Sequence, residues 1–368
     1  MNHPIGLYLH IPFCDGKCAY CSFFSRRCDS DMMDDYSHHL KKAVRYWSKR
    51  CPRTVDTVYF GGGTPSLLGH ERLSDLLNCI GASFCVTDGA EVTVEVNPTS
   101  ADHLDLSALR KSGFNRLSIG MQSVNDRELQ ILERRHDSEA VRRTVLRARE
   151  AGFDNVSLDV MLAIPEQTRE SLNKTLSFCA ECGVEHVSCY MLKIEKGTRF
   201  FDRKDSLSLF SDDEQAAFYE QTVTTLSRLG FRQYEISNFS KPGFESRHNL
   251  HYWHDEEYLG IGPSAHSFLD GKRFFYEADF SSFYSGKIVN ESVGGDSDEY
   301  IMLALRLTEG LVFERYHQRF RKPLDKSFID AALALEEHGL CTVTDKSISL
   351  TTKGFLVSNS VIAHLLYQ

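Results

Sequence analysis

Three cysteines near the N-terminus, Cys14, Cys18 and Cys21, have a spacing that suits a metal cofactor. They lie on one short segment as C-x3-C-x2-C, whereas a structural zinc site usually takes four protein ligands in separate pairs. A [4Fe–4S] cluster is usually held by four thiolates, so three thiolates would leave one iron open to a small chelating ligand. The residues alone leave two other interpretations open: a zinc site completed by a distant histidine, and three unrelated thiols.

A second candidate binding segment, GGGTP at residues 61–65, follows a strand-like run at residues 57–60. Glycines without side chains let a backbone approach a ligand closely and present its N–H and C=O groups. The segment has neither the Gly-Lys-Ser/Thr end of a Walker loop nor the G-x-G-x-x-G of a dinucleotide site. Taken alone it is typical of an ordinary turn, but its place one β-unit after the cysteines favours a shared site.

Six short runs rich in Val, Ile, Leu, Phe and Tyr are expected to be the strands that position these segments. Helical patterns lie between them. In one, Val141, Val145 and Ala148 share a face, and Ser138 is the expected N-cap with Gly152 as the stop. Alternating strands and helices predict an α/β fold with a parallel sheet, either open or curved into a barrel. The expected strands are residues 5–11, 57–60, 91–96, 116–119, 155–161 and 186–191.

The alternation of short strands and helices ends at about residue 205, and the chain is expected to consist of three units. A core at residues 1–205 is followed by a segment at 206–289 that closes one side of it. That segment begins with a helix at about 212–229 and continues through a loop-rich, His- and aromatic-rich stretch at 234–275. Residues 286–298 are polar and contain glycine, so they are the best candidate for a linker. Helices around a hairpin at 341–350 predict a winged-helix-like unit at 290–368.

The composition excludes several classes of protein. The 368 residues are 42% hydrophobic and 25% charged, which is typical of a globular chain, and no apolar run is long enough to span a membrane. A net charge of −9 argues against bulk nucleic-acid binding. Eleven cysteines, an odd number, without a secretory signal indicate a reducing, cytoplasmic setting.

The cysteine spacing after a strand, together with the glycine segment, resembles the radical S-adenosylmethionine (SAM) superfamily. The resemblance implies a partial (β/α)6 TIM-like barrel and a [4Fe–4S] cluster whose open iron binds the amino and carboxylate groups of SAM. The run YLHIPFC at residues 8–14 further resembles the oxygen-independent coproporphyrinogen dehydrogenase group within that superfamily. The residues that match expected SAM or cluster-edge positions are Tyr8, Tyr20, Gly62, Gly63, Thr64, Glu95, Gln122, Arg134 and Asp159.

Strand ends are where barrel ligands bind, so a carboxylate there can accept ribose hydroxyls and an arginine can pair with a carboxylate. Glu95, Gln122, Arg134 and Asp159 lie at or just after expected strand ends, but each of them, taken singly, is more often a solvated or structural polar residue. Ala163 departs from the group's pattern, which usually has glycine at that position.

Two subfamilies of the group compete. The dehydrogenase has a further cysteine where this chain has Phe23, and a substantial N-terminal extension for which there is no room before Tyr8. Both differences favour the sister family of heme chaperones. The resemblance then implies a protein that binds heme and delivers it to an acceptor protein, with peripheral association to membrane-bound acceptors. The alternative is a dehydrogenase that oxidatively decarboxylates coproporphyrinogen III, so the sequence leaves open whether the chain is an enzyme.

The run HNLHYW at residues 248–253 matches the H-N-x-x-Y-W element associated with heme in the chaperone family. Histidine is a good axial ligand of heme iron, and Tyr and Trp offer flat apolar faces, so His248 is the favoured heme contact. His248, His251 and His254 could instead bind a metal at i, i+3 and i+6, or simply pack against the barrel.

Overall fold

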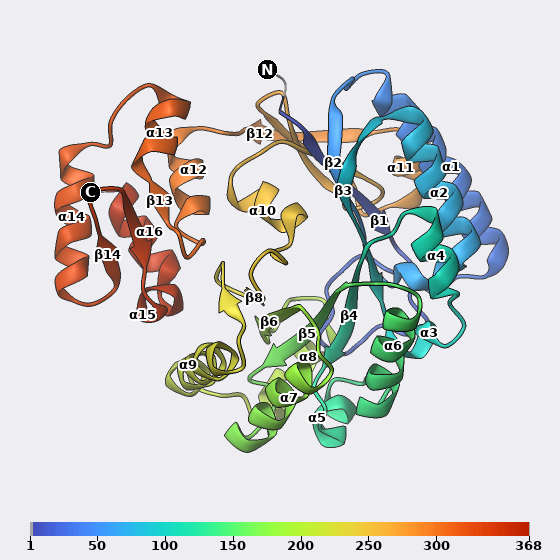
Figure 1. Cartoon of the computed structure of the whole chain (residues 1–368), viewed down its shortest axis with the longest axis horizontal. Helices are drawn as coiled ribbons and strands as arrows, with labels where there is room; N and C mark the ends of the chain where they lie inside the picture. Colours follow the sequence, from blue (N-terminus) through green and yellow to red (C-terminus); the bar gives the residue numbers. More distant parts are fainter. Residues whose placement is uncertain (1–2, 368) are drawn as a thin grey trace.

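The computed structural model describes residues 3–367, and a twelve-stranded sheet organises most of them (Figure 1). Strands β1 to β6 run parallel and neighbour one another in chain order. Most of their residues are buried, because helices cover the outer face of the curved sheet and the inner face lines its interior. They are β1 (Ile5–Ile11), β2 (Thr54–Gly62), β3 (Cys85–Val96), β4 (Arg116–Gln122), β5 (Asn155–Leu162) and β6 (His186–Met191).

All six predicted strands are confirmed. The helices between them lie outside the curve of the sheet (Figure 1). One predicted cap is wrong: Asp137, rather than Ser138, accepts the hydrogen bond from the Ala140 N–H, so Ser138 is the first helical residue. The intervening helices are α1 (Ser30–Ser48), a 3-10 turn η1 (Pro65–Leu68), α2 (Gly69–Ser83), α3 (Pro98–Ala101), α4 (Leu106–Ser112), α5 (Asp126–Ile131), α6 (Ser138–Glu150) and α7 (Arg169–Glu181).

The parallel strands continue into further strands on both sides. β9 pairs parallel with β1 and leads to antiparallel β10, β11 and β12, while β8 and β7 extend the other edge beyond β6. Within residues 3–367 the edge strands β12 and β7 do not pair, so the sheet is an open, partial barrel. These strands are β7 (Arg232–Gln233), β8 (Asn238–Ser240), β9 (Tyr258–Ile261), β10 (His266–Leu269), β11 (Lys272–Tyr276) and β12 (Ile288–Val293).

The stretch at 234–275, expected to be loop-rich, has loops between the short strands β8 to β11 and a helix, α10 (Arg247–Trp253). One prediction about this part of the chain is wrong. The expected linker at 286–298 contains β12, the outermost strand. Four of the six β12 residues are exposed, because an edge strand buries little of either face. Its polar composition therefore resembles that of a linker. The other helices here are α8 (Arg199–Asp202), a 3-10 turn η2 (Lys204–Ser206), α9 (Asp212–Arg228) and α11 (Phe280–Tyr284).

A C-terminal helical unit with a small sheet packs beside α10 (Figure 1). The predicted hairpin at 341–350 is present as β14 and β15, and β13 adds a third strand. Asp255, buried after α10, pairs with Arg319 of this unit at 2.6 Å and with Arg273 of β11 at 3.1 Å. The elements are α12 (Ser297–Ala304), β13 (Leu311–Val312), α13 (Phe313–Phe320), α14 (Lys326–Glu337), β14 (Cys341–Val343), β15 (Ser347–Leu350), α15 (Thr352–Leu356) and α16 (Ser358–Leu366).

Membrane-crossing helices are not found in residues 3–367, since none of the helices there is both long and apolar enough.

Candidate functional site

The three cysteines lie on a loop that leaves the carboxyl end of β1. Two backbone hydrogen bonds close its base, from Cys14 N to Arg26 O at 3.0 Å and from Arg26 N to Pro12 O at 2.9 Å. Ala19 anchors the middle of the loop, because it is fully buried in a small apolar cluster with Leu132 and Phe200. The loop is thus held at both its base and its centre.

The three thiols are free and half-buried, and they line one cavity. Burial raises the pKa of the Cys14 and Cys21 thiols, so a bound cation is what would favour their thiolate forms. Among residues 3–367, no three His, Cys, Asp or Glu side chains are grouped so as to hold a metal ion. A [4Fe–4S] cluster does not need such convergence, since each thiolate binds a different iron. The donor set therefore fits a cluster with three protein ligands.

A cavity of about 450 Å³ extends from the cysteine loop down the inside of the sheet. Residues from β2, β3, β4, β5 and β6 line it, as expected for a ligand site at the ends of parallel strands. Tyr8 does not line it; its hydroxyl lies 3.0 Å from His10 Nδ1, and its ring stacks on Tyr59 of the cavity wall. The residues expected from the sequence that do line the cavity are Cys14, Cys18, Cys21, Tyr20, Gly62, Gly63, Thr64, Glu95, Gln122, Arg134 and Asp159.

The glycine segment packs against the cysteine loop more closely than the sequence suggests. A Cβ on Gly63 would lie 2.5 Å from the Phe13 carbonyl oxygen, and one on Gly62 would lie 2.6 Å from the His10 ring. The N–H of Gly63 donates to Ile11 O at 2.8 Å, and the N–H of Thr64 donates to Phe13 O at 2.7 Å. These donors are used within the chain, which corrects the expectation that the segment presents them to a ligand.

Arg134 connects the cysteine loop to the cavity wall. Its Nη1 donates to Cys18 Sγ at 3.5 Å and its Nη2 donates to Gly120 O at 2.5 Å. On the opposite side of the loop, the Thr64 hydroxyl lies 3.1 Å from Cys14 Sγ. Both contacts place polar side chains against thiols, where they would stabilise thiolate charge.

Two carboxyl groups, Glu95 and Asp159, share the cavity wall. Burial, followed by repulsion from Asp159, raises the pKa of Glu95 to about 7, although Tyr59 donates to it at 2.9 Å. Burial also raises the pKa of Asp159 to about 6, against the hydrogen bond that Ser118 donates at 3.1 Å. Two such groups can accept hydrogen bonds from ligand hydroxyls once they are ionised.

Several residues of the cavity were not expected from the sequence, and two of them, Arg116 and Tyr59, act on the Glu95 carboxyl group. Arg116, only 2% exposed, lines the cavity, and its Nε has no hydrogen-bond partner among the described residues. Its position at the start of a buried strand, where a charge is unusual, is the signal that could have found it. Tyr59, which directs Glu95, alternates with buried residues of β2 and carries no such signal.

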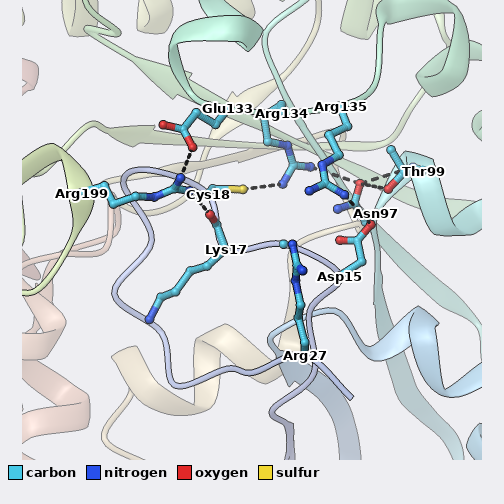
Figure 2. Close-up of a pocket in the computed structure, with 11 residues that line it drawn as sticks. Asp15, Lys17, Cys18, Arg27, Asn97, Thr99, Glu133, Arg134, Arg135 and Arg199 are labelled. Atoms are coloured by element: carbon cyan, nitrogen blue, oxygen red, sulfur yellow. Dashed lines mark hydrogen bonds and ion pairs between the residues drawn. The ribbon is translucent and has the colours of Figure 1, made fainter. Parts of the chain in front are cut away.

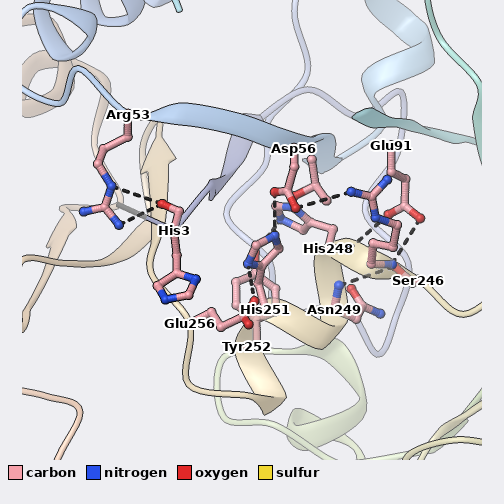
Figure 3. A network of polar contacts seen from close by, with 12 residues as sticks. His3, Arg53, Asp56, Glu91, Ser246, His248, Asn249, His251, Tyr252 and Glu256 are labelled. Carbon is pink, nitrogen blue, oxygen red and sulfur yellow. Dashed lines mark hydrogen bonds and ion pairs between the residues drawn. The ribbon is translucent and has the colours of Figure 1, made fainter. Parts of the chain in front are cut away.

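Helix α10, which carries HNLHYW, lies against β1 and β2 on the side of the sheet opposite α1 and α2 (Figure 1). Glu91 of β3 accepts hydrogen bonds from the Arg247 and His248 N–H groups at 3.1 and 3.0 Å. A carboxylate there satisfies donors at the helix start. Figure 3 shows this network of contacts around α10.

His248 is 1% exposed, and both of its ring nitrogens have partners. Nδ1 lies 2.8 Å from the Thr57 hydroxyl, and Nε2 lies 2.8 Å from the Tyr252 hydroxyl. The ring stacks on Tyr59 at 5.1 Å, and burial lowers the pKa of His248 to about 3. In this conformation no ring nitrogen of His248 is free, so coordination of heme iron by His248 would require its contact with Thr57 or Tyr252 to break.

The alternative of a metal held by three histidines of this helix is contradicted by their contacts. His251 lies between Asp56 at 2.8 Å and Glu256 at 2.9 Å, and His254 contacts Glu309 of the C-terminal unit at 3.0 Å. Burial alone would lower the pKa of His251, but the two carboxylates outweigh it and raise that pKa to about 9. Each histidine thus serves a different polar contact.

Comparison with known proteins gives the family. A model described as "Radical SAM superfamily" matches residues 8–179, and one described as "HemN C-terminal domain" matches residues 298–357. A Bacillus subtilis protein named "Heme chaperone HemW" is 33% identical over 375 residues, with 98% of each chain covered. The chain belongs to the HemW family of the radical SAM superfamily. A Mycobacterium tuberculosis protein of the same name is 34% identical, over 99% of this chain and 95% of that one.

A solved structure of Escherichia coli coproporphyrinogen III oxidase (HemN), described as a radical SAM enzyme, has the same fold as this HemW-family chain. The TM-score is 0.85, with 100% of this chain and 91% of the other covered. At 24% sequence identity, this similarity shows the fold alone. The predicted radical SAM partial barrel with a C-terminal helical unit is thereby confirmed.

Ala163, which departs from the pattern of its group, follows β5 with φ of 57° and is 6% exposed. This left-handed conformation is unfavourable for residues with a Cβ and explains why glycine is usual there. We expect Ala163→Gly to raise the free energy of unfolding of this HemW-family chain by about 0.5–1 kcal/mol, because relief of strain exceeds the added entropy of the unfolded chain. Urea denaturation with Ala140→Gly in α6 as a control, expected to destabilise, checks this; a loss of stability in Ala163→Gly would contradict it.

The raised pKa values of the buried carboxyl groups make the stability of this HemW-family chain depend on pH. Since the folded-state pKa of Glu95, about 7, exceeds the ordinary value of 4.5, ligand-free stability should fall as pH rises from about 4.5 to 7.

If ionised carboxylates accept SAM hydroxyls, SAM affinity should rise over pH 5.5–8. Calorimetric titration with SAM at a series of pH values measures this affinity, and Glu95→Gln should remove the increase in affinity near pH 7. An unchanged SAM affinity across this range would contradict the assignment.

Proposed function

We propose that this chain is a heme chaperone of the radical SAM type, which binds a [4Fe–4S] cluster, SAM and heme and passes heme to an acceptor protein. Its similarity to the Bacillus subtilis protein named as a heme chaperone, over 98% of both chains, is the observation that carries the proposal. The proposal includes action in the cytoplasm, with peripheral association to acceptors at the membrane, and no binding of nucleic acid.

In this proposal Cys14, Cys18 and Cys21 hold the cluster, which supplies an iron for chelation of SAM. The polar residues of the cavity wall bind the rest of SAM. Arg134, already directed at Cys18, is placed to meet a carboxylate beside the loop, and Glu95 and Asp159 are placed to accept hydroxyls. The full set proposed for SAM is Tyr20, Gly62, Gly63, Thr64, Glu95, Gln122, Arg134 and Asp159, with Tyr8 stacked on Tyr59 of the wall.

Phe23 supports the chaperone over the dehydrogenase. The side chain follows the third cysteine by two positions, is 64% exposed and lines the cavity. No thiol is therefore available where the dehydrogenase pattern has its further cysteine. An exposed aromatic ring at a cavity mouth is suited to contact a flat apolar ligand.

Heme titration of the anaerobically reconstituted protein tests the proposal. We expect a Soret absorption change that saturates at one heme per chain, and a stable complex that survives gel filtration. Serum albumin in excess serves as a competitor that removes loosely adsorbed heme. A protein that retains no heme after this competition would overturn the proposal.

A further inference from the structure

A basic pocket of about 320 Å³ lies beside the cysteine loop, outside the cavity assigned to SAM (Figure 2). Five basic side chains and two acidic ones line it, in a chain whose net charge is −9. It shares Gly16, Lys17, Cys18, Asn97 and Arg134 with the cavity, so the two hollows adjoin along one wall. The basic residues are Lys17, Arg27, Arg134, Arg135 and Arg199, and the acidic residues are Asp15 and Glu133.

Two of these basic groups are committed to acidic partners. Arg199 pairs with Glu133, and Arg135 lies 3.9 Å from Asp15. In contrast, no carboxylate of residues 3–367 lies within 4.0 Å of the Lys17 ammonium or the Arg27 guanidinium. Figure 2 shows both side chains at the pocket without a dashed contact from their charged ends. Two exposed cations are therefore available to an anionic ligand.

The adjoining part of the cavity is apolar at its mouth. Phe23 is 64% exposed and Tyr190 is 43% exposed, and Met191 and Leu192 continue the same lining. A ligand that fits both hollows has a flat apolar body and two negative groups on one edge. Heme has this shape, since its two propionates lie on the same edge of the macrocycle.

We propose that Lys17 and Arg27 bind the two propionate carboxylates of heme while the macrocycle lies across the cavity mouth against Phe23. This rests on the proposed heme-binding function and names the part of the surface that performs it. It leaves His248 in its buried contacts, because it needs no ligand from α10. Each carboxylate gains a charge-assisted hydrogen bond, which is weakened by salt because both cations are exposed.

Esterified heme tests the inference. With the reconstituted full chain, the dissociation constant for heme dimethyl ester should exceed that for heme about tenfold, since two exposed ion pairs together contribute about a factor of ten. The double variant Lys17→Ala with Arg27→Ala should bind heme as weakly as wild type binds the ester, and should no longer distinguish the two ligands. Lys42→Ala with Arg45→Ala, an exposed pair on α1, is the matched control and should behave as wild type.

The outcomes separate this inference from the function on which it rests. If wild type binds neither heme nor the ester, the proposed function fails. If wild type binds both equally tightly, or if the double variant still prefers heme tenfold, heme binding stands but this propionate site is overturned. Equal binding of heme and its dimethyl ester is also the result expected if Lys17 and Arg27 instead bind an acidic protein.

Discussion

Replacing Cys18 with serine should leave the purified chain without iron or acid-labile sulfide and without measurable SAM binding. With three thiols available on the loop, the loss of one leaves two ligands for a cluster that already has an open iron. Arg134 also loses its sulfur partner and keeps only its oxygen partners, Gly120 O and Asn97 Oδ1. Iron and sulfide analysis after anaerobic reconstitution, followed by calorimetric titration with SAM, measures both effects.

Cys28 provides the matched control, because it is a half-buried thiol close to the loop but outside the C-x3-C-x2-C spacing. Cys28→Ser should keep wild-type iron, sulfide and SAM affinity. Wild type that purifies with one zinc and no sulfide would contradict the cluster assignment. So would a Cys18→Ser variant that retains a full complement of iron.

His248→Ala should weaken SAM binding by about tenfold or more and destabilise the fold, while heme binding persists. The ring lies behind the cavity: it stacks on Tyr59, whose hydroxyl directs Glu95, and Glu95 accepts the Gly62 N–H at 3.1 Å. Removing it creates a void and leaves the Thr57 and Tyr252 hydroxyls without their buried partner. These losses together cost about 3–4 kcal/mol of unfolding free energy.

Two further variants keep this prediction specific. His248→Gln, which can still hydrogen-bond one of the two hydroxyls, should recover part of the stability and of the SAM affinity. His266→Ala, an exposed histidine of β10, should change neither. Loss of heme with unchanged SAM affinity in His248→Ala would show that the histidine is a heme ligand after all.

The central architecture was predictable because its signals are local. The strands β1 to β6 are short apolar runs between turn residues, and the cysteine spacing is legible without any structure. The edge strand β12 was not predictable, since Val293 and its exposed neighbours have no buried face to mark them as a strand. Pairing with β11 supplies the order that its own sequence does not.

The cavity was predictable only in part. Glu95, Asp159 and Arg134 were expected from their places at strand ends and from family resemblance. Arg116 and Tyr59 lie at the start of β4 and within β2, where a residue's role depends on which neighbours the sheet brings to it. His248 is a further case. The sequence of the motif suggests an iron ligand, but a histidine can equally hold buried hydroxyl groups by hydrogen bonds, and only its contacts distinguish the two roles.

The most direct test of the chaperone assignment is an anaerobic assay of the reconstituted full chain with SAM, a reductant and coproporphyrinogen III. We expect no protoporphyrinogen and no released carbon dioxide, while the same preparation forms its one-to-one heme complex. Escherichia coli coproporphyrinogen III oxidase, which shares the fold, serves as the positive control. Formation of protoporphyrinogen by this chain at a rate comparable to the control would contradict the chaperone assignment.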